Sequence, residues 1–113
     1  MAPESGKLVR DRIPQIIRAS GLEPSVYRAG SAEYSRRLRA KLVEEVDEVL
    51  AADSESLLDE LADVFEVLCA LASEAGVDEA GLWAAAAAKA EKRGGFSERW
   101  VWTGNSEPAA AGG

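Results

Sequence analysis

The sequence predicts an all-α protein: an antiparallel bundle of one short and three longer helices, with a short extended segment near the C-terminus. Apolar residues recur at helical spacing over three long stretches, and residues that favour helix starts and helix ends separate these stretches. The connection between the second and third helices is short, which favours antiparallel neighbours. With 113 residues, the chain has room for one domain.

The first half of the chain carries two helical signals. A short helix is predicted over residues 13–20, where Pro14 suits a first helical turn and Gly21 suits a left-handed end. A loop follows, and Ser31 is the expected N-cap of a long helix over residues 32–51.

Two further helices follow in the second half. One is predicted over residues 57–75, with Asp53 or Ser54 as its cap and Gly76 as its end. The last begins after the N-cap Asp78, contains a run of alanines that favours helix, and ends at residues 94–95, which are both glycine.

The chain ends are expected to be disordered tails over residues 1–6 and 104–113, which leaves 7–103 as the folded domain. Residues 96–103 are expected to be extended, with Trp100 and Trp102 on the same side. These rings either cover an open side of the bundle or a partner subunit, or stack on a nucleobase. Trp83 is expected in the core.

Composition narrows the classes of function. The net charge of −7 disfavours nucleic acid polymers and anionic membranes as partners. The absence of histidine excludes imidazole bases and histidine-ligated metals, and the single cysteine, Cys69, excludes an internal disulfide. With neither a signal peptide nor a spanning segment in sight, we expect a soluble, cytoplasmic protein. Aromatic residues make up only 6%, so the core is thin and a homodimer or higher homo-oligomer is expected.

Carboxylates occupy positions that a simple core would not use. Glu45 falls within the apolar stripe of the second helix, and Glu48 lies one turn further along the same side. In the third helix, Glu60 and Asp63 lie beside the apolar face with the same spacing. Because the two helices are expected to be antiparallel, all four carboxylates converge. Such a cluster needs either protonation or a divalent cation, and all-oxygen ligands favour Mg²⁺ or Mn²⁺.

Basic residues flank this acidic centre at both ends of the chain. One group precedes the first helix and another ends the last, and together they suggest a ligand made of a metal ion and a polyphosphate. The candidate phosphate-binding residues are Lys7, Arg10, Arg12, Lys89, Lys92 and Arg93. The last three also offset the negative end of their helix.

Four segments together resemble the MazG-like all-α nucleotide pyrophosphohydrolases. They are KLVRDRIPQII at 7–17, KLVEEVDEVL at 41–50, LLDELADVFEVLCALA at 57–72 and EKRGGF at 91–96. The closest resemblance is to the small branch labelled phosphoribosyl-ATP pyrophosphohydrolase-like or house-cleaning NTP pyrophosphatase, whose E-E-x-x-E and E-x-x-D signature reads here as residues 44–48 and 60–63.

This resemblance implies an enzyme that uses Mg²⁺ to cleave a nucleoside triphosphate into the monophosphate and pyrophosphate. The implied metal ligands are Glu45, Glu48, Glu60 and Asp63. Glu44 and Glu45 are the implied catalytic carboxylates, and Glu44 either orients water or holds a lysine such as Lys41, a further substrate-binding candidate. Two alternatives remain open: cleavage of phosphoribosyl-ATP in histidine biosynthesis, and a non-catalytic acidic module for dimerisation or partner binding.

Overall fold

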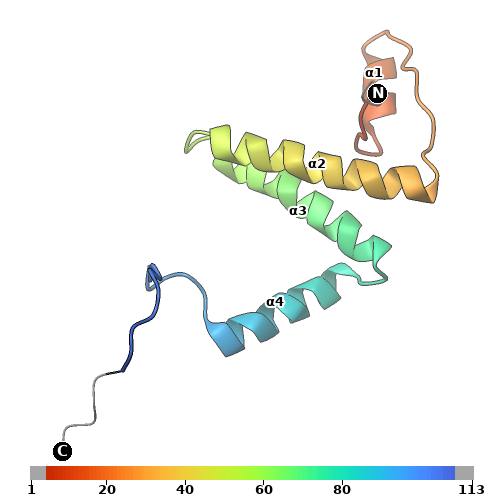
Figure 1. Ribbon diagram of the computed structural model, residues 1–113. Helices are drawn as coiled ribbons and strands as arrows, with labels where there is room; N and C mark the ends of the chain where they lie inside the picture. Colours follow the sequence, from red (N-terminus) through yellow and green to blue (C-terminus); the bar gives the residue numbers. More distant parts are fainter. Residues whose placement is uncertain (1–4, 109–113) are drawn as a thin grey trace, which may run out of the picture.

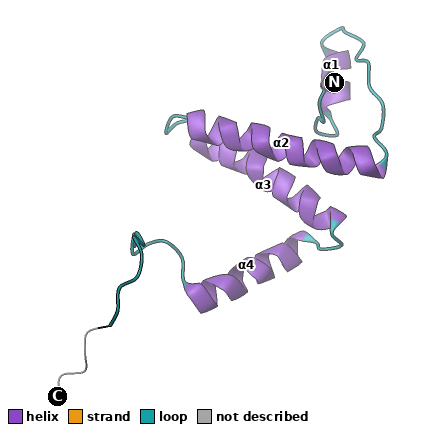
Figure 2. Ribbon diagram, viewed as in Figure 1, coloured by secondary structure: helices purple, strands orange, loops and turns teal. Residues whose placement is uncertain are grey.

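The computed structural model describes residues 5–108 and consists of four helices. They are α1 (Ile13–Ala19), α2 (Ser31–Ala51), α3 (Leu57–Glu74) and α4 (Glu79–Arg93). Within the described residues there is no β-strand, so the predicted all-α class is confirmed (Figure 2). Residues 1–4 and 109–113, which include most of the first predicted tail and half of the second, lie outside the described range.

The helix ends follow from local chemistry. Asp78 accepts a hydrogen bond from the backbone N–H of Gly81 at 2.8 Å, which makes it the predicted N-cap of α4. Gly76 and Gly94 have φ values of 83° and 78°, and α3 and α4 end just before them. The N-cap of α2 is Gly30 rather than Ser31, and Asp53 caps the turn before α3 by accepting from the Ser56 N–H at 2.9 Å.

Helices α2 and α3 form an antiparallel hairpin, and α4 leaves the far end of α3 at an angle (Figure 1). Leu38 of α2 and Val67 of α3 are the buried apolar residues between them, at 3% and 6% exposure. The radius of gyration is 20.7 Å, compared with about 13 Å for a compact domain of this length. The hairpin is therefore the structural centre, and the single chain buries little else.

The segment after α4 is irregular. Residues 96–98 form a turn that the Arg99 N–H closes by donating to the Phe96 carbonyl at 3.1 Å. Trp100 and Trp102 are 90% and 80% exposed, so within this chain they do not cover the helices. No helix among the described residues is long and apolar enough to cross a membrane.

The expectation that Trp83 lies in the core is wrong. Its side chain is 59% exposed, and its ring centroid lies 5.8 Å from that of Phe65. The only helix that α4 packs against is α3, among the helices described, so one side of the indole is covered and the other is open.

The hairpin contact can be tested by truncating Leu38. We expect Leu38→Ala to reduce the free energy of unfolding by about 2–5 kcal/mol, because it leaves a cavity between α2 and α3. Leu22→Ala is the matched control, since this leucine lies in a loop with 68% exposure. Urea denaturation measures both values, and equal losses would contradict a core centred on α2 and α3.

Candidate functional site

Three carboxylates from the two hairpin helices meet at one place. One oxygen each from Glu45, Glu60 and Asp63 lies within 4.8 Å of the others, and we call these three residues the acidic cluster. Glu45 is 8% exposed, as its position in the apolar stripe of α2 predicts. The antiparallel pairing of the helices brings it opposite the first turns of α3.

The acidic cluster carries an electrostatic cost. Burial raises the pKa of Glu60, and the neighbouring charges of Glu48 and Asp63 raise it further, with Glu45 and Asp59 adding to the effect. Glu48 is exposed and outside the three-residue cluster, although its charge reaches Glu60. A positive charge placed among these oxygens would relieve the repulsion.

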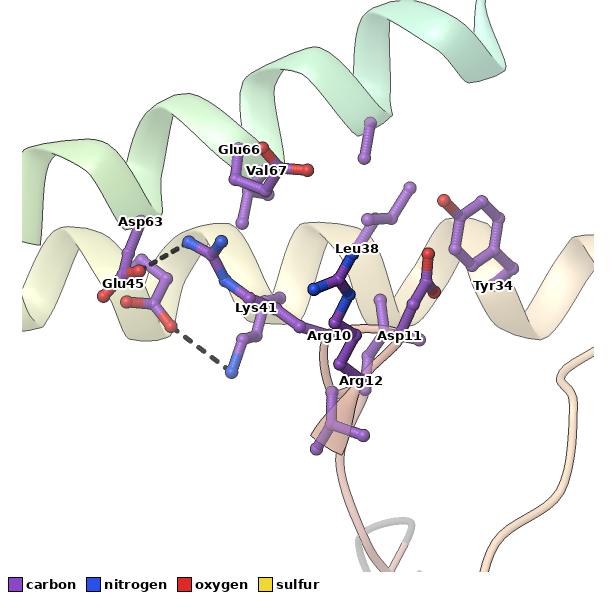
Figure 3. A pocket seen from close by; sticks show the side chains of 13 residues that line it. Arg10, Asp11, Arg12, Tyr34, Leu38, Lys41, Glu45, Asp63, Glu66 and Val67 are labelled. Carbon is purple, nitrogen blue, oxygen red and sulfur yellow. Dashed lines mark hydrogen bonds and ion pairs between the residues drawn. The ribbon is translucent and has the colours of Figure 1, made fainter. Parts of the chain in front are cut away.

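Two basic side chains face the acidic cluster (Figure 3). The Arg10 Nη2 lies 2.6 Å from the Asp63 Oδ1, and the Lys41 Nζ lies 3.3 Å from the Glu45 Oε1. The pair of Lys41 and Glu45 is the more shielded, with 18% and 11% of the side chains exposed. The first pair joins residues 53 positions apart, and the second joins residues one helical turn apart on α2.

Glu44 lies beside these pairs and contacts two lysines. Its carboxylate is 3.3 Å from the Nζ of Lys7 and 3.5 Å from the Nζ of Lys41. Burial raises the pKa of Glu44, but the hydrogen bond from Lys7 and the charge of Lys41 outweigh it, so the pKa lies below its ordinary value. Of the two roles that the resemblance implies for Glu44, the one of holding Lys41 has a contact in the structure.

A pocket of about 440 Å³ extends from the acidic cluster between the N-terminal segment and the hairpin. Its charged end contains Glu45, Asp63 and the basic residues that pair with them, and its other end contains Tyr34 and Leu38 (Figure 3). The lining is completed by Leu8, Val9, Asp11, Arg12, Glu66, Val67 and Ala70. The pocket therefore joins the carboxylates of Glu45 and Asp63 to a region where an aromatic ring lies beside Asp11.

The basic residues of α4 lie elsewhere. Lys89, Lys92 and Arg93 are exposed, do not line this pocket, and form no ion pair within residues 5–108. Of the residues predicted from the sequence, the structure thus pairs Lys7, Arg10 and Lys41 with carboxylates. It places Arg12 in the pocket lining and leaves the α4 group apart in the single chain.

Sequence reasoning missed two features of this region. Tyr34 lines the pocket, but its spacing in the sequence marks it only as one of the apolar residues along α2. Arg37 and Glu33 have the spacing of a helical ion pair, but nothing in the sequence indicates that Arg37 also reaches the carbonyls of residues 5 and 6.

The crowding of carboxylates predicts how stability depends on pH. Because the pKa of Glu60 is raised in the folded state, the folded protein holds this proton more tightly than the unfolded chain. Protonated Glu60 therefore stabilises the folded protein at low pH, and this contribution is lost as the pH rises through the folded-state pKa of Glu60. In a chelator, we therefore expect Glu60→Gln to raise the melting temperature at pH 7 by a few degrees and to change it little below the ordinary pKa of a glutamate.

Differential scanning fluorimetry across pH measures this difference. Glu55→Gln is the control, because this exposed residue has no part in the cluster. With a saturating divalent cation, the wild type should instead melt at a higher temperature than Glu60→Gln, because only the wild type keeps all three carboxylates that would bind the ion. A Glu60→Gln variant that is less stable than the wild type at pH 7 in chelator would contradict the proposed repulsion.

Comparison with known proteins finds a curated relative and a matching family model. An uncharacterized protein of Mycolicibacterium smegmatis is 54% identical over 48 residues, which cover 42% of this chain and 49% of that protein. The chain thus spans about half the length of this curated relative. No solved structure matches the chain significantly.

A family model described as phosphoribosyl-ATP pyrophosphohydrolase matches residues 15–90. The match covers more than half of the chain and includes the acidic cluster, Lys41 and Tyr34. It begins after Lys7 and Arg10, and it ends before Lys92 and Arg93. The chain therefore belongs to the phosphoribosyl-ATP pyrophosphohydrolase family, within the MazG-like all-α proteins.

Proposed function

We propose that this protein is a nucleotide pyrophosphohydrolase that uses Mg²⁺ or Mn²⁺ to cleave a nucleoside triphosphate into the monophosphate and pyrophosphate. One observation carries the proposal: of three clustered carboxylates, Glu45 and Asp63 line a pocket together with basic side chains. This combination suits a cation bound together with phosphates. Family membership supports the same reaction class.

The acidic cluster fits a hard divalent cation. Its donors are all oxygens, one of the three residues is buried, and the pKa of Glu60 is raised by burial and by the neighbouring negative charges. Glu45, Glu60 and Asp63 would hold the ion, with Glu48 as a fourth ligand after a side-chain movement. When bound, the ion would neutralise charge on the phosphate oxygens and help to activate water.

The basic side chains would bind the phosphates. A cation in the cluster competes with Arg10 for Asp63 and with Lys41 for Glu45, which makes both basic groups available to phosphate oxygens. Lys7 lies near these groups because it pairs with Glu44, which also contacts Lys41. Arg12 lines the pocket. Glu44 is a weak proton acceptor because its pKa is lowered, so we assign it to holding the two lysines.

The end of the pocket that contains Tyr34 would bind the base and sugar. Tyr34 offers a ring face there, and aromatic rings stack on nucleobases of any sequence. Glu45 lies eleven positions after Tyr34, or about 16 Å along a helix. This length accommodates a nucleotide that lies along α2 with its phosphates at the acidic cluster.

Two substrate classes share this chemistry. The first is a nucleoside triphosphate removed from the nucleotide pool, and the second is phosphoribosyl-ATP, which the family description names. Both are cleaved at the same kind of phosphoric anhydride bond. Pyrophosphate release from a panel that includes both, with and without Mg²⁺, separates the two.

The carboxylates of the cluster can be tested by isosteric substitution. We expect Glu45→Gln and Asp63→Asn to lower kcat/KM by about 100-fold or more, because each removes a ligand charge at the cation. Asp47→Asn is the matched control, because this exposed residue lies on the same helix. Equal pyrophosphate release from all four proteins would remove the cluster from the reaction.

Glu45→Leu separates the enzyme from a non-catalytic acidic module. If the protein is only a module, this variant is more stable than the wild type and Mg²⁺ stabilises neither, since an apolar residue avoids the cost of burying a charge. The enzyme hypothesis predicts instead that turnover is lost and that Mg²⁺ stabilises only the wild type.

We propose further that a second copy of the chain covers the apolar side of the hairpin. At about 100° per residue, the helical period places one set of exposed apolar residues from α2 and α3 on the side opposite the N-terminal segment. These residues are Val43, Val46, Leu50, Leu57, Leu61 and Leu68, each between 39% and 79% exposed. Exposed apolar residues gathered on one side of a helical hairpin are typical of an interface between subunits.

A charge in the patch should separate the subunits. We expect the wild type to sediment as a dimer or larger assembly at micromolar concentration, and Leu61→Glu to sediment as a monomer, because burying the new carboxylate is costly. Leu22→Glu, in a loop outside the patch, is the control. A monomeric wild type in analytical ultracentrifugation would contradict this proposal.

A further inference from the structure

The N-terminal segment, residues 5–12, is attached to α2 through its main chain. The guanidinium of Arg37 donates to the Gly6 carbonyl at 3.0 Å and to the Ser5 carbonyl at 2.9 Å. Both acceptors are backbone atoms, so the contact determines where the chain runs. Gly6 has a φ of 79°, a left-handed conformation that glycine adopts without strain, and the chain turns there.

Arg37 is itself held in place. Its Nε donates to Glu33 Oε2 at 2.7 Å, one helical turn earlier, and the hydroxyl of Tyr27 donates to the same carboxylate. The side chains of Arg37 and Glu33 are only 14% and 23% exposed. Hydrogen bonds from Tyr27 and then Arg37 lower the pKa of Glu33, so it is ionised at neutral pH.

The segment brings two basic residues to the candidate site. Lys7 follows Gly6 directly and pairs with Glu44 of α2, and Arg10 pairs with Asp63 of α3. The side chains of Lys7 and Arg10 are 64% and 54% exposed, and ion pairs this exposed contribute little to holding a segment in place. The contacts of Arg37, whose side chain is more shielded from water, hold the segment in place.

We propose that Arg37, held by Glu33 and Tyr27, is a positioning residue that anchors residues 5–6 so that Lys7 and Arg10 reach the phosphates of the nucleotide. This inference rests on the proposed function of the pocket. Arg37 does not line the pocket that contains the acidic cluster, so it acts through the segment. Residues 5–12 precede the region that the family model matches, so their role follows from these contacts alone.

Arg37→Met tests the anchor by steady-state kinetics. We expect KM for the nucleotide to rise about tenfold with a smaller change in kcat, because the loss falls on substrate binding. Arg37→Lys should not restore KM, since an ammonium cannot serve three acceptors in the geometry of a guanidinium. Arg39→Met is the control: this residue lies on the same helix, pairs with Glu74 and does not contact the segment.

A double-mutant cycle shows whether Arg37 acts through the basic residues. In a Lys7→Met, Arg10→Met background, Arg37→Met should raise KM no further, because the side chains that it positions are gone. A rise as large as in the wild-type background would overturn the proposal, since Arg37 would then contribute by another route.

A measurement without nucleotide separates this proposal from the proposed function. Trypsin cleaves after Lys7 and Arg10, and mass spectrometry follows the loss of the N-terminal peptide. We expect cleavage to be about tenfold faster in Arg37→Met and unchanged in Arg39→Met, with helix content verified by circular dichroism. Unchanged cleavage in Arg37→Met overturns the anchor. Faster cleavage in a protein whose wild type releases no pyrophosphate supports the anchor and contradicts the proposed function.

Discussion

The crowding of Glu45, Glu60 and Asp63 is the constraint on which the account of this protein depends. Three carboxylate oxygens within 4.8 Å repel one another, and one of the residues is buried in a hairpin that has few other buried residues. A protein of marginal stability gains nothing from such an arrangement unless a positive charge compensates it. Arg10 and Lys41 supply part of this charge through direct pairs, and a divalent cation would supply more.

The small core and the candidate site are both built from the hairpin of α2 and α3. Leu38 and Val67 join α2 to α3, but the apolar residues on the far side of the hairpin stay uncovered in the single chain. One side of the hairpin is thus free for a subunit contact, while the other carries the carboxylates and the N-terminal segment.

Much of this architecture could be predicted from local sequence signals. Asp78, Gly76 and Gly94 mark helix ends because capping and left-handed backbone depend on neighbouring residues alone. The burial of Glu45 followed from the helical period, and its meeting with Glu60 and Asp63 followed from the short connection between two antiparallel helices.

The features that could not be predicted depend on contacts between distant segments. Arg37 binds carbonyls 31 and 32 positions away, and no side-chain pattern marks a backbone acceptor. Trp83 was expected in a core that α4 does not form, because this helix packs against α3 alone among the described helices. The separation of Lys92 and Arg93 from the pocket likewise reflects the angle at which α4 leaves α3, which the short turn before it does not determine.

The most direct measurement is a crystal structure of the protein with Mg²⁺ and a non-hydrolysable nucleoside triphosphate analogue. The account predicts an ion bound by oxygens of Glu45, Glu60 and Asp63 at about 2.1 Å, with Arg10 and Lys41 turned toward phosphate oxygens. If these two side chains instead keep their pairs with Asp63 and Glu45, and no ion lies among the carboxylates at saturating Mg²⁺, the central claim is contradicted.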